Sequence, residues 1–144
     1  MCGICGVFLL DRAAQADRIV LEKMNRTLIH RGPDDEGYLV SGPVGLAMRR
    51  LSIIDLETGH QPLSNEYETI WIVYNGETYN YPELRAELLS RGHRFKTRSD
   101  TEVIVHLYEE YAEDCVMRLN GMFAFALWDS IKQRLFLARD RDAA

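Results

Sequence analysis

The chain has 144 residues, 47% of them hydrophobic and 27% charged, which is typical of one folded domain rather than a disordered segment. The net charge of −5, with no basic run longer than two residues, argues against nucleic acid and anionic membranes as partners. No apolar run is long enough to span a bilayer, and no secretory signal is visible. Three cysteines, an odd number, argue against a disulfide framework and predict a reducing, cytoplasmic location.

The first half of the chain predicts strands on both sides of one helix. Residues 4–10 form an apolar run typical of a buried strand, and residues 14–30 carry apolar side chains at helical spacing. A turn-rich loop at 31–37 follows, and residues 38–54 predict two short strands around a Ser-Gly-Pro turn. Residues 59–68 are expected to form a loop.

The second half predicts three more strands. Residues 69–75 are rich in β-branched and aromatic side chains, and residues 122–129 and 133–140 form a strand pair. Because strands and helices occur in clusters rather than in strict alternation, the pattern favours an antiparallel α+β fold over a doubly wound one.

Two helices lie between these strands. The helix at 81–91 has Asn80 as its predicted N-cap and Gly92 at its end. The next helix, at 99–113, is predicted to open with a capping box of Ser99 and Glu102.

The cysteines at the amino terminus, Cys2 and Cys5, have the spacing of a redox or metal-binding pair. A thioredoxin-like pair follows a strand and opens a helix, and a zinc site needs a second ligand pair; neither context is present. The alternative depends on position, because removal of Met1 would leave Cys2 with a free α-amine. An α-amine has a pKa of about 7.7–8.0 and a thiol one of about 8.5, so the amine can take the thiol proton. From the Met-Cys start alone, an incidental cysteine beside a buried N-terminal strand is the better interpretation.

Six stretches occur in this order: MCGICGVF, HRGPDDEG, RLSIIDLETGHQPL, YNGETYN, SDTEV and LNGMFAFALWD. Together they resemble the glutaminase domain of asparagine synthetase, one of the class II glutamine amidotransferases in the N-terminal nucleophile hydrolase superfamily. The resemblance implies an α+β fold, a four-layer αββα sandwich of two mainly antiparallel sheets. It also implies hydrolysis of the glutamine side-chain amide to glutamate and ammonia through a thioester on Cys2.

The same resemblance assigns roles to residues around Cys2. The Asn75 side chain and the Gly76 N–H would form the oxyanion hole, Arg50 would bind the α-carboxylate of glutamine, and Asp100 its ammonium group. Further pocket residues are Glu77, a weaker candidate for the ammonium side, and the backbone of Leu51, Ser52 and Ile54. Each of these residues also has a purely structural interpretation. Asn75-Gly76 could form a hairpin turn, Arg50 could be a surface arginine, and Asp100 could be an acid that suits a helix N-terminus. The loop of Arg31, Gly32 and Pro33 is assigned only a supporting role.

The sequence departs from the family at its end. The synthetase domain that binds ATP and aspartate is absent from the 144 residues, and the final RDRDAA differs from the family's continuation, so the C-terminal strands are expected to be missing. No metal or cofactor is expected in this chain, because ATP and Mg²⁺ belong to the synthetase domain. The expected partners are L-glutamine and a synthetase domain or subunit, and homo-oligomerisation is left open. The alternatives are a class II amidotransferase with another ammonia acceptor and an inactive remnant or interaction domain.

Overall fold

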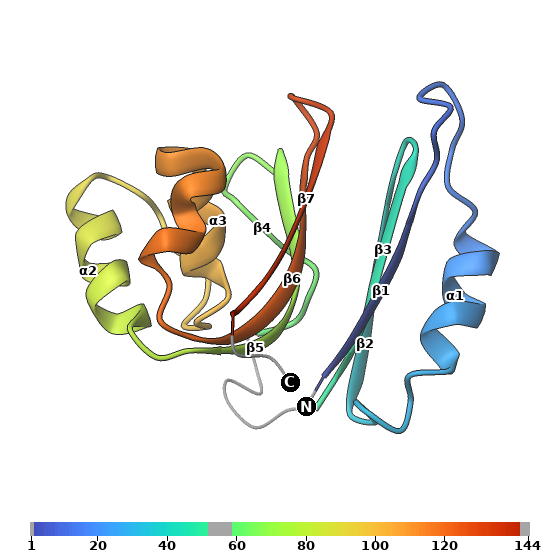
Figure 1. Ribbon diagram of the computed structural model, residues 1–144, viewed down its shortest axis with the longest axis horizontal. Coiled ribbons are helices and arrows are strands. Elements are labelled where there is room, and N and C mark those ends of the chain that lie inside the picture. The colour runs from blue at the N-terminus through green and yellow to red at the C-terminus, as the bar shows by residue number, and fades with distance from the viewer. Residues whose placement is uncertain (1, 52–58, 142–144) are drawn as a thin grey trace.

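Two antiparallel sheets stack face to face between helices in the computed structural model, which describes residues 2–51 and 59–141 (Figure 1). Helix α1 covers the outer face of one sheet, and α2 and α3 cover the outer face of the other. The expected four-layer αββα arrangement is therefore confirmed. Within the described residues, no helix has the length and apolar character needed to cross a bilayer.

The first sheet has three strands in the order β1 (Gly3–Phe8), β3 (Val44–Arg50) and β2 (Asp35–Ser41). The predicted strand pair around the Ser-Gly-Pro turn is confirmed, since Ser41 pairs with Val44. Helix α1 (Arg18–Arg26) is shorter than expected, because the Asp17 side chain accepts the N–H of Ile19 and fixes its start.

The second sheet has four strands in chain order: β4 (Leu63–Ser64), β5 (Ile70–Thr78), β6 (Gly121–Asp129) and β7 (Arg134–Arg139). Strand β5 continues three residues beyond its predicted end, because its last residues pair with β6. The sequence analysis missed β4, which lies in a predicted loop, and the 3₁₀ helix Ala112–Arg118.

Helices α2 (Tyr81–Ser90) and α3 (Glu102–Tyr111) are present, but their predicted caps are partly wrong. The Asn80 side chain makes no capping bond; it donates to the Arg118 carbonyl and accepts the N–H of Asn120, both at 2.9 Å. Gly92 does close α2, with a positive φ of 96° that favours glycine.

The predicted capping box of Ser99 and Glu102 is wrong. Helix α3 starts at Glu102, three residues later than expected, and its N-cap position, Thr101, makes no side-chain capping bond. The Glu102 carboxylate instead accepts the backbone N–H groups of Lys96 and Thr97, both at 2.7 Å. This side chain therefore fixes the loop before the helix rather than the helix end.

Two hydrophobic cores lie on opposite faces of the second sheet. Because successive side chains alternate along a strand, Val73 of β5 faces the first sheet, whereas Ile72 and Tyr74 face the helices. Trp128 is fully buried between the sheets, and its indole N–H donates to the Ser41 hydroxyl at 3.1 Å, joining β6 to β2. Burying each such large apolar side chain is worth about 1.5–3 kcal/mol.

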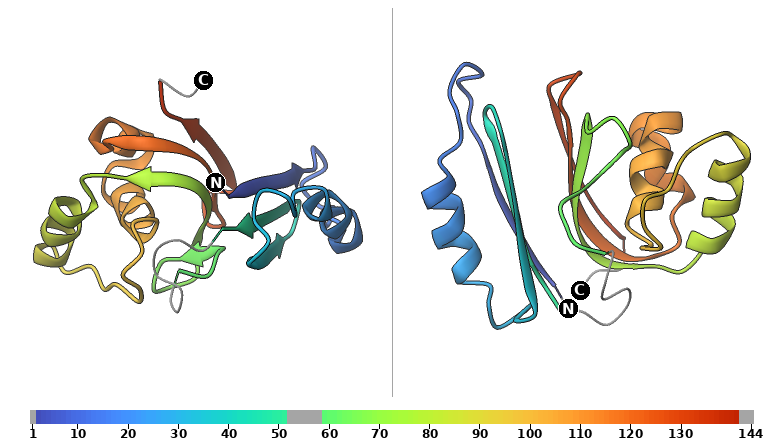
Figure 2. Two further views of the ribbon diagram at one scale, coloured as in Figure 1. Left: turned by 90° about the horizontal axis from the view of Figure 1, so that it is seen from below. Right: turned by 180° about the vertical axis from the view of Figure 1, so that it is seen from behind.

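The two sheets come together at the end of the sandwich where β1 begins and diverge toward the opposite end, as Figure 1 and the right panel of Figure 2 show. A cavity of about 390 Å³ lies between them, bordered by β1, β6 and β7. Its lining is apolar, so it does not suit glutamine, which carries charged and amide groups.

Candidate active site

Cys2 stands immediately before β1, and its side chain packs on the same inter-sheet face as Ile4 and Phe8. Its sulfur accepts the N–H of Leu51 at 3.4 Å, and the thiol lies 3.9 Å from the Leu51 carbonyl oxygen. The residue is half-buried, so the thiol is neither sealed in the core nor fully in solvent. Among the described residues, neither a histidine nor a carboxylate hydrogen-bonds to this sulfur.

The second contact of Cys2 comes from a loop to which the sequence analysis gave only a supporting role. The Arg31 Nε donates to the Cys2 carbonyl at 3.2 Å and holds the amino terminus in place. Gly32 beside it lies so close to β3 that an added Cβ would stand 2.4 Å from the Arg49 carbonyl carbon. Arg31 and Gly32 thus help to position Cys2. In the sequence, only the turn-forming Gly32-Pro33 dipeptide pointed to this loop.

The Cys-x-x-Cys interpretation does not fit this geometry. Cys2 lies three residues from Cys5 along an extended segment, so the two side chains point to opposite faces. All three cysteines are free, and burial raises the pKa of the Cys5 thiol.

Asn75 and Gly76 lie inside β5, where they pair with Ala124 and Phe123 of β6. The hairpin-turn interpretation of this dipeptide is therefore wrong. Asn75 shares a strand face with Val73, so it belongs to the inter-sheet face on which Cys2 packs. An added Cβ on Gly76 would stand 2.1 Å from the Met122 carbonyl oxygen, so only glycine fits this close approach of β5 to β6.

Asp100 is bound to the end of β5 rather than to the helix that follows it. Its Oδ2 accepts the N–H of Thr78 at 2.8 Å, and it precedes the first residue of α3 by two positions, not within its first turn as expected. Burial, together with the negative charge of Glu77, raises the pKa of the Asp100 carboxyl above its ordinary range. Two neighbouring carboxyl groups here favour binding of a cation.

The structure distinguishes Arg50 from its neighbour Arg49. Arg50 ends β3, is only 7% exposed and shares the inter-sheet face with Met48. The Arg49 side chain lies on the other face, is 13% exposed and forms an ion pair with Glu36 at 2.6 Å. A buried guanidinium does not fit the surface-arginine interpretation. Of the predicted pocket backbone, Leu51 contacts Cys2, while Ser52 and Ile54 lie outside the described residues.

Sequence reasoning missed Gln61, which fixes the strand that carries Asn75. Its buried side-chain oxygen accepts the N–H of Tyr74 at 2.6 Å, just beyond the two residues of β5 that pair with β4. Its amide nitrogen lies 3.5 Å from the Thr101 hydroxyl, at the start of α3. The residue lies in the GHQPL stretch, but a buried glutamine cannot be recognised there from pattern alone.

Comparison with known proteins identifies a shared domain. A family model described as "Glutamine amidotransferase domain" matches residues 1–142. Asparagine synthetase [glutamine-hydrolyzing] 1 of Bacillus subtilis is 51% identical over 97% of this chain, and the enzyme of that name from Arabidopsis thaliana is 46% identical over 97%. The chain spans 22% and 24% of the lengths of these two relatives.

A solved structure supports the same fold at low identity. The glutamine phosphoribosylpyrophosphate amidotransferase of B. subtilis, in complex with ADP and GMP, matches with a TM-score of 0.74 and 19% identity. The match covers 95% of this chain and 37% of that one.

Proposed function

The chain belongs to the glutamine amidotransferase domain family, and on that premise we propose that it hydrolyses the side-chain amide of glutamine to glutamate and ammonia. The observation that carries the proposal is the half-buried Cys2 thiol beside the Leu51 N–H, one residue after the buried Arg50. The residues proposed as nucleophile and as carboxylate-binding group thus lie at the same end of β1 and β3.

Cys2 would act as the nucleophile once Met1 is removed. The α-amine takes the thiol proton, the sulfur bonds to the amide carbon, and the carbon–nitrogen bond breaks as the amine returns the proton to the leaving nitrogen. Ammonia and a thioester result. Water then attacks the thioester, the amine accepts a proton from this water and passes it to the sulfur, and glutamate leaves.

The surrounding residues would hold the substrate and its developing charge. Asn75 and the Gly76 N–H would stabilise the oxyanion, for which a single donor is worth about 3–4 kcal/mol. The Arg50 guanidinium suits the α-carboxylate because its planar fork can make two parallel hydrogen bonds. Asp100, with Glu77 beside it, would bind the α-ammonium group. The backbone of Leu51, Ser52 and Ile54 completes the proposed pocket.

In a longer protein this domain would supply ammonia for asparagine synthesis. The asparagine synthetases that it resembles are about four times its length. ATP and Mg²⁺ would bind to the remainder of such a protein rather than to the glutaminase residues, and the cytoplasm is the proposed location.

The test replaces the proposed nucleophile. Cys2→Ala should abolish glutamate release, and so should retention of Met1, because it acylates the base. Cys5→Ala, a nearby free thiol, is the matched control and should keep activity. A glutamine-mimicking electrophile should label Cys2 on peptide mapping. Turnover by folded Cys2→Ala protein would overturn the proposal, and a free Cys2 terminus with neither label nor hydrolysis would identify an inactive domain instead.

A further inference from the structure

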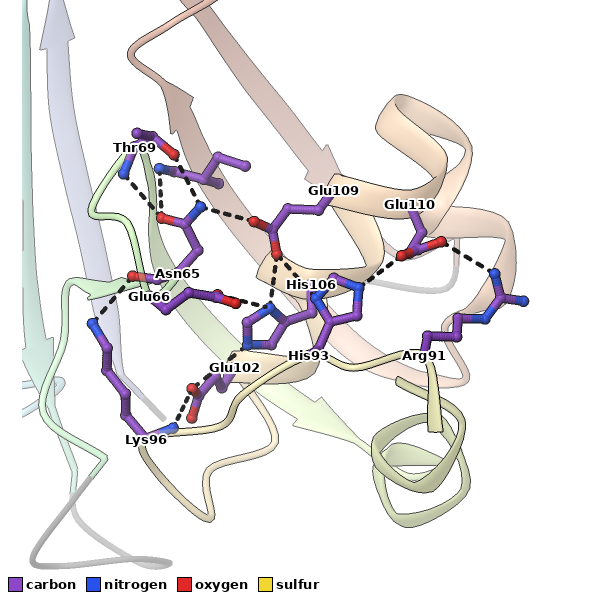
Figure 3. Close-up of polar contacts among 11 residues, drawn as sticks. Asn65, Glu66, Thr69, Arg91, His93, Lys96, Glu102, His106, Glu109 and Glu110 are labelled. Atoms are coloured by element: carbon purple, nitrogen blue, oxygen red, sulfur yellow. Dashed lines mark hydrogen bonds and ion pairs between the residues drawn. The ribbon is translucent and has the colours of Figure 1, made fainter. Parts of the chain in front are cut away.

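A cluster of imidazoles and carboxylates lies away from Cys2, where α3 meets the loop after α2 and the turn after β4 (Figure 3). His106 comes from α3 and is fully buried, and His93 comes from the loop. Their rings lie 4.8 Å apart, centre to centre. Four carboxylates face them: Glu66, Glu102, Glu109 and Glu110.

Two of these carboxylates are already occupied by other donors. Glu102 accepts the backbone N–H groups of Lys96 and Thr97 and also the Thr97 hydroxyl. Glu110 is paired with the Arg91 guanidinium at 3.1 Å. Donors from the protein therefore already compensate the negative charges of Glu102 and Glu110.

The other two carboxylates converge on the ring nitrogens. One Glu109 oxygen accepts from the Asn65 amide, while the other lies 2.8 Å from His106 Nδ1 and 3.3 Å from His93 Nδ1. The Glu66 Oε2 lies 3.7 Å from the same His106 Nδ1 and, although it is buried, has no hydrogen-bond partner among the described residues. One proton on His106 Nδ1 cannot satisfy both the Glu109 oxygen and the Glu66 oxygen, whereas a cation held between these oxygens can.

The far side of each imidazole faces a carboxylate. His93 Nε2 lies 2.7 Å from Glu110, and His106 Nε2, which lacks a hydrogen-bond partner in the described part of the chain, lies 3.7 Å from Glu102. Histidines that bind metals characteristically donate their second N–H to a carboxylate, which fixes the tautomer and the ring orientation. Both rings thus present Nδ1 inward and Nε2 to an acid.

We propose that His93, His106, Glu109 and Glu66 form a divalent-cation site whose chemistry suits zinc. Zinc bonds of about 2.0–2.2 Å in a tetrahedron place neighbouring ligand atoms roughly 3.3 Å apart. The Glu109 and Glu66 oxygens lie 2.8, 3.3 and 3.7 Å from the Nδ1 atoms that they face. One ligand atom from each of His93, His106 and Glu109 lies within 4.8 Å of the others. This proposal departs from the sequence-based expectation that the chain has no metal.

Charge and access both suit a cation. Four carboxylates surround the two imidazoles, so the cluster is rich in negative charge and attracts a cation. The Glu109 and Glu66 side chains are 19% and 21% exposed, so the cluster reaches the molecular surface. A bound ion would join α3, the loop after α2 and the turn after β4, which is a structural role.

The experiment measures Zn²⁺ binding by calorimetry and thermal melting on the full chain, freed of metal with a chelator. Cys2→Ala is the background, because an N-terminal thiol and amine can chelate zinc by themselves. His93→Gln and Glu66→Gln remove partly exposed ligands and so avoid the risk that the buried His106 poses to folding. His30→Gln, an exposed histidine outside the cluster, is the matched control.

We expect one Zn²⁺ per chain, a melting temperature that rises with Zn²⁺, and affinity at least tenfold weaker in both ligand variants. The His30→Gln protein should bind within twofold of the background, and Co²⁺ should give the intense visible absorption of a tetrahedral site. The proposal is overturned if the background protein takes up no Zn²⁺, or if folded His93→Gln and Glu66→Gln proteins bind it as well as the background does.

Discussion

Replacement of Gly76 by alanine tests the proposed oxyanion hole and the packing that positions it. The new Cβ would stand 2.1 Å from the Met122 carbonyl oxygen and 2.6 Å from the Phe123 Cα, and both atoms are backbone. The gap to the oxygen must widen to at least 3.0 Å, so β5 and β6 have to separate by about 0.9 Å. Overpacking of this kind costs about 1–3 kcal/mol of unfolding free energy.

The same displacement moves the Gly76 N–H away from the position it would need in the transition state. A misplacement of about 1 Å can lower a rate roughly 100-fold, so we expect kcat to fall by about that factor at saturating glutamine. The assay is glutamate release, with urea unfolding of the same samples to measure stability.

Gly121→Ala is the matched control, because its Cβ would meet the Glu77 carbonyl oxygen at the same 2.1 Å across the same strand pair. It should lose similar stability and raise KM, since it disturbs Thr78 and Asp100, but keep kcat within about threefold. A folded Gly76→Ala protein with nearly unchanged kcat, or a Gly121→Ala protein with an equal loss, would refute the reasoning.

Three further outcomes are expected. Arg50→Lys should raise KM for glutamine at least tenfold in steady-state assays, because an ammonium cannot make the paired hydrogen bonds, whereas Arg49→Lys should not. The proposed binding of the substrate ammonium group requires ionised Asp100, and burial raises the carboxyl pKa of this residue. As pH drops, kcat/KM should therefore fall at a higher pH than for an ordinary aspartate, and Asp100→Asn should remove that titration. Leu107→Ala, at a fully buried position, should cost about 2–5 kcal/mol in denaturant unfolding, whereas Leu137→Ala, 66% exposed, should cost less than about 0.5 kcal/mol.

The elements that could be predicted from sequence are those whose local pattern agrees with their tertiary partners. The Ser-Gly-Pro turn and the aromatic strand at 122–129 needed no knowledge of distant contacts. Where local and long-range preferences compete, pattern reasoning failed. The turn preference of Asn75-Gly76 is overridden by pairing with β6, and the cap preference of Glu102 by amides from the preceding loop.

The candidate site shows the same division. The position of Cys2 in the chain, together with the resemblance, was enough to suggest a nucleophile. Only the orientation of β3 distinguishes Arg50 from Arg49, because alternation puts Arg50 on the inter-sheet face with Met48, and that face cannot be read from two adjacent arginines. The His93 and His106 cluster left no metal-binding spacing in the sequence, because its ligands come from separate segments of the chain.

The hydrogen bond from Trp128 to Ser41 gives the molecule an internal optical reporter. Of the two tryptophans, Trp128 alone is sealed between the sheets, whereas Trp71 is half-buried and donates to the Glu68 carbonyl. Water reaching the Trp128 indole would shift its fluorescence to longer wavelength. During unfolding, the emission wavelength of Trp128 therefore reports separation of the two sheets, while circular dichroism reports loss of the helices. Comparing the two signals gives the order in which the layers separate, without a label.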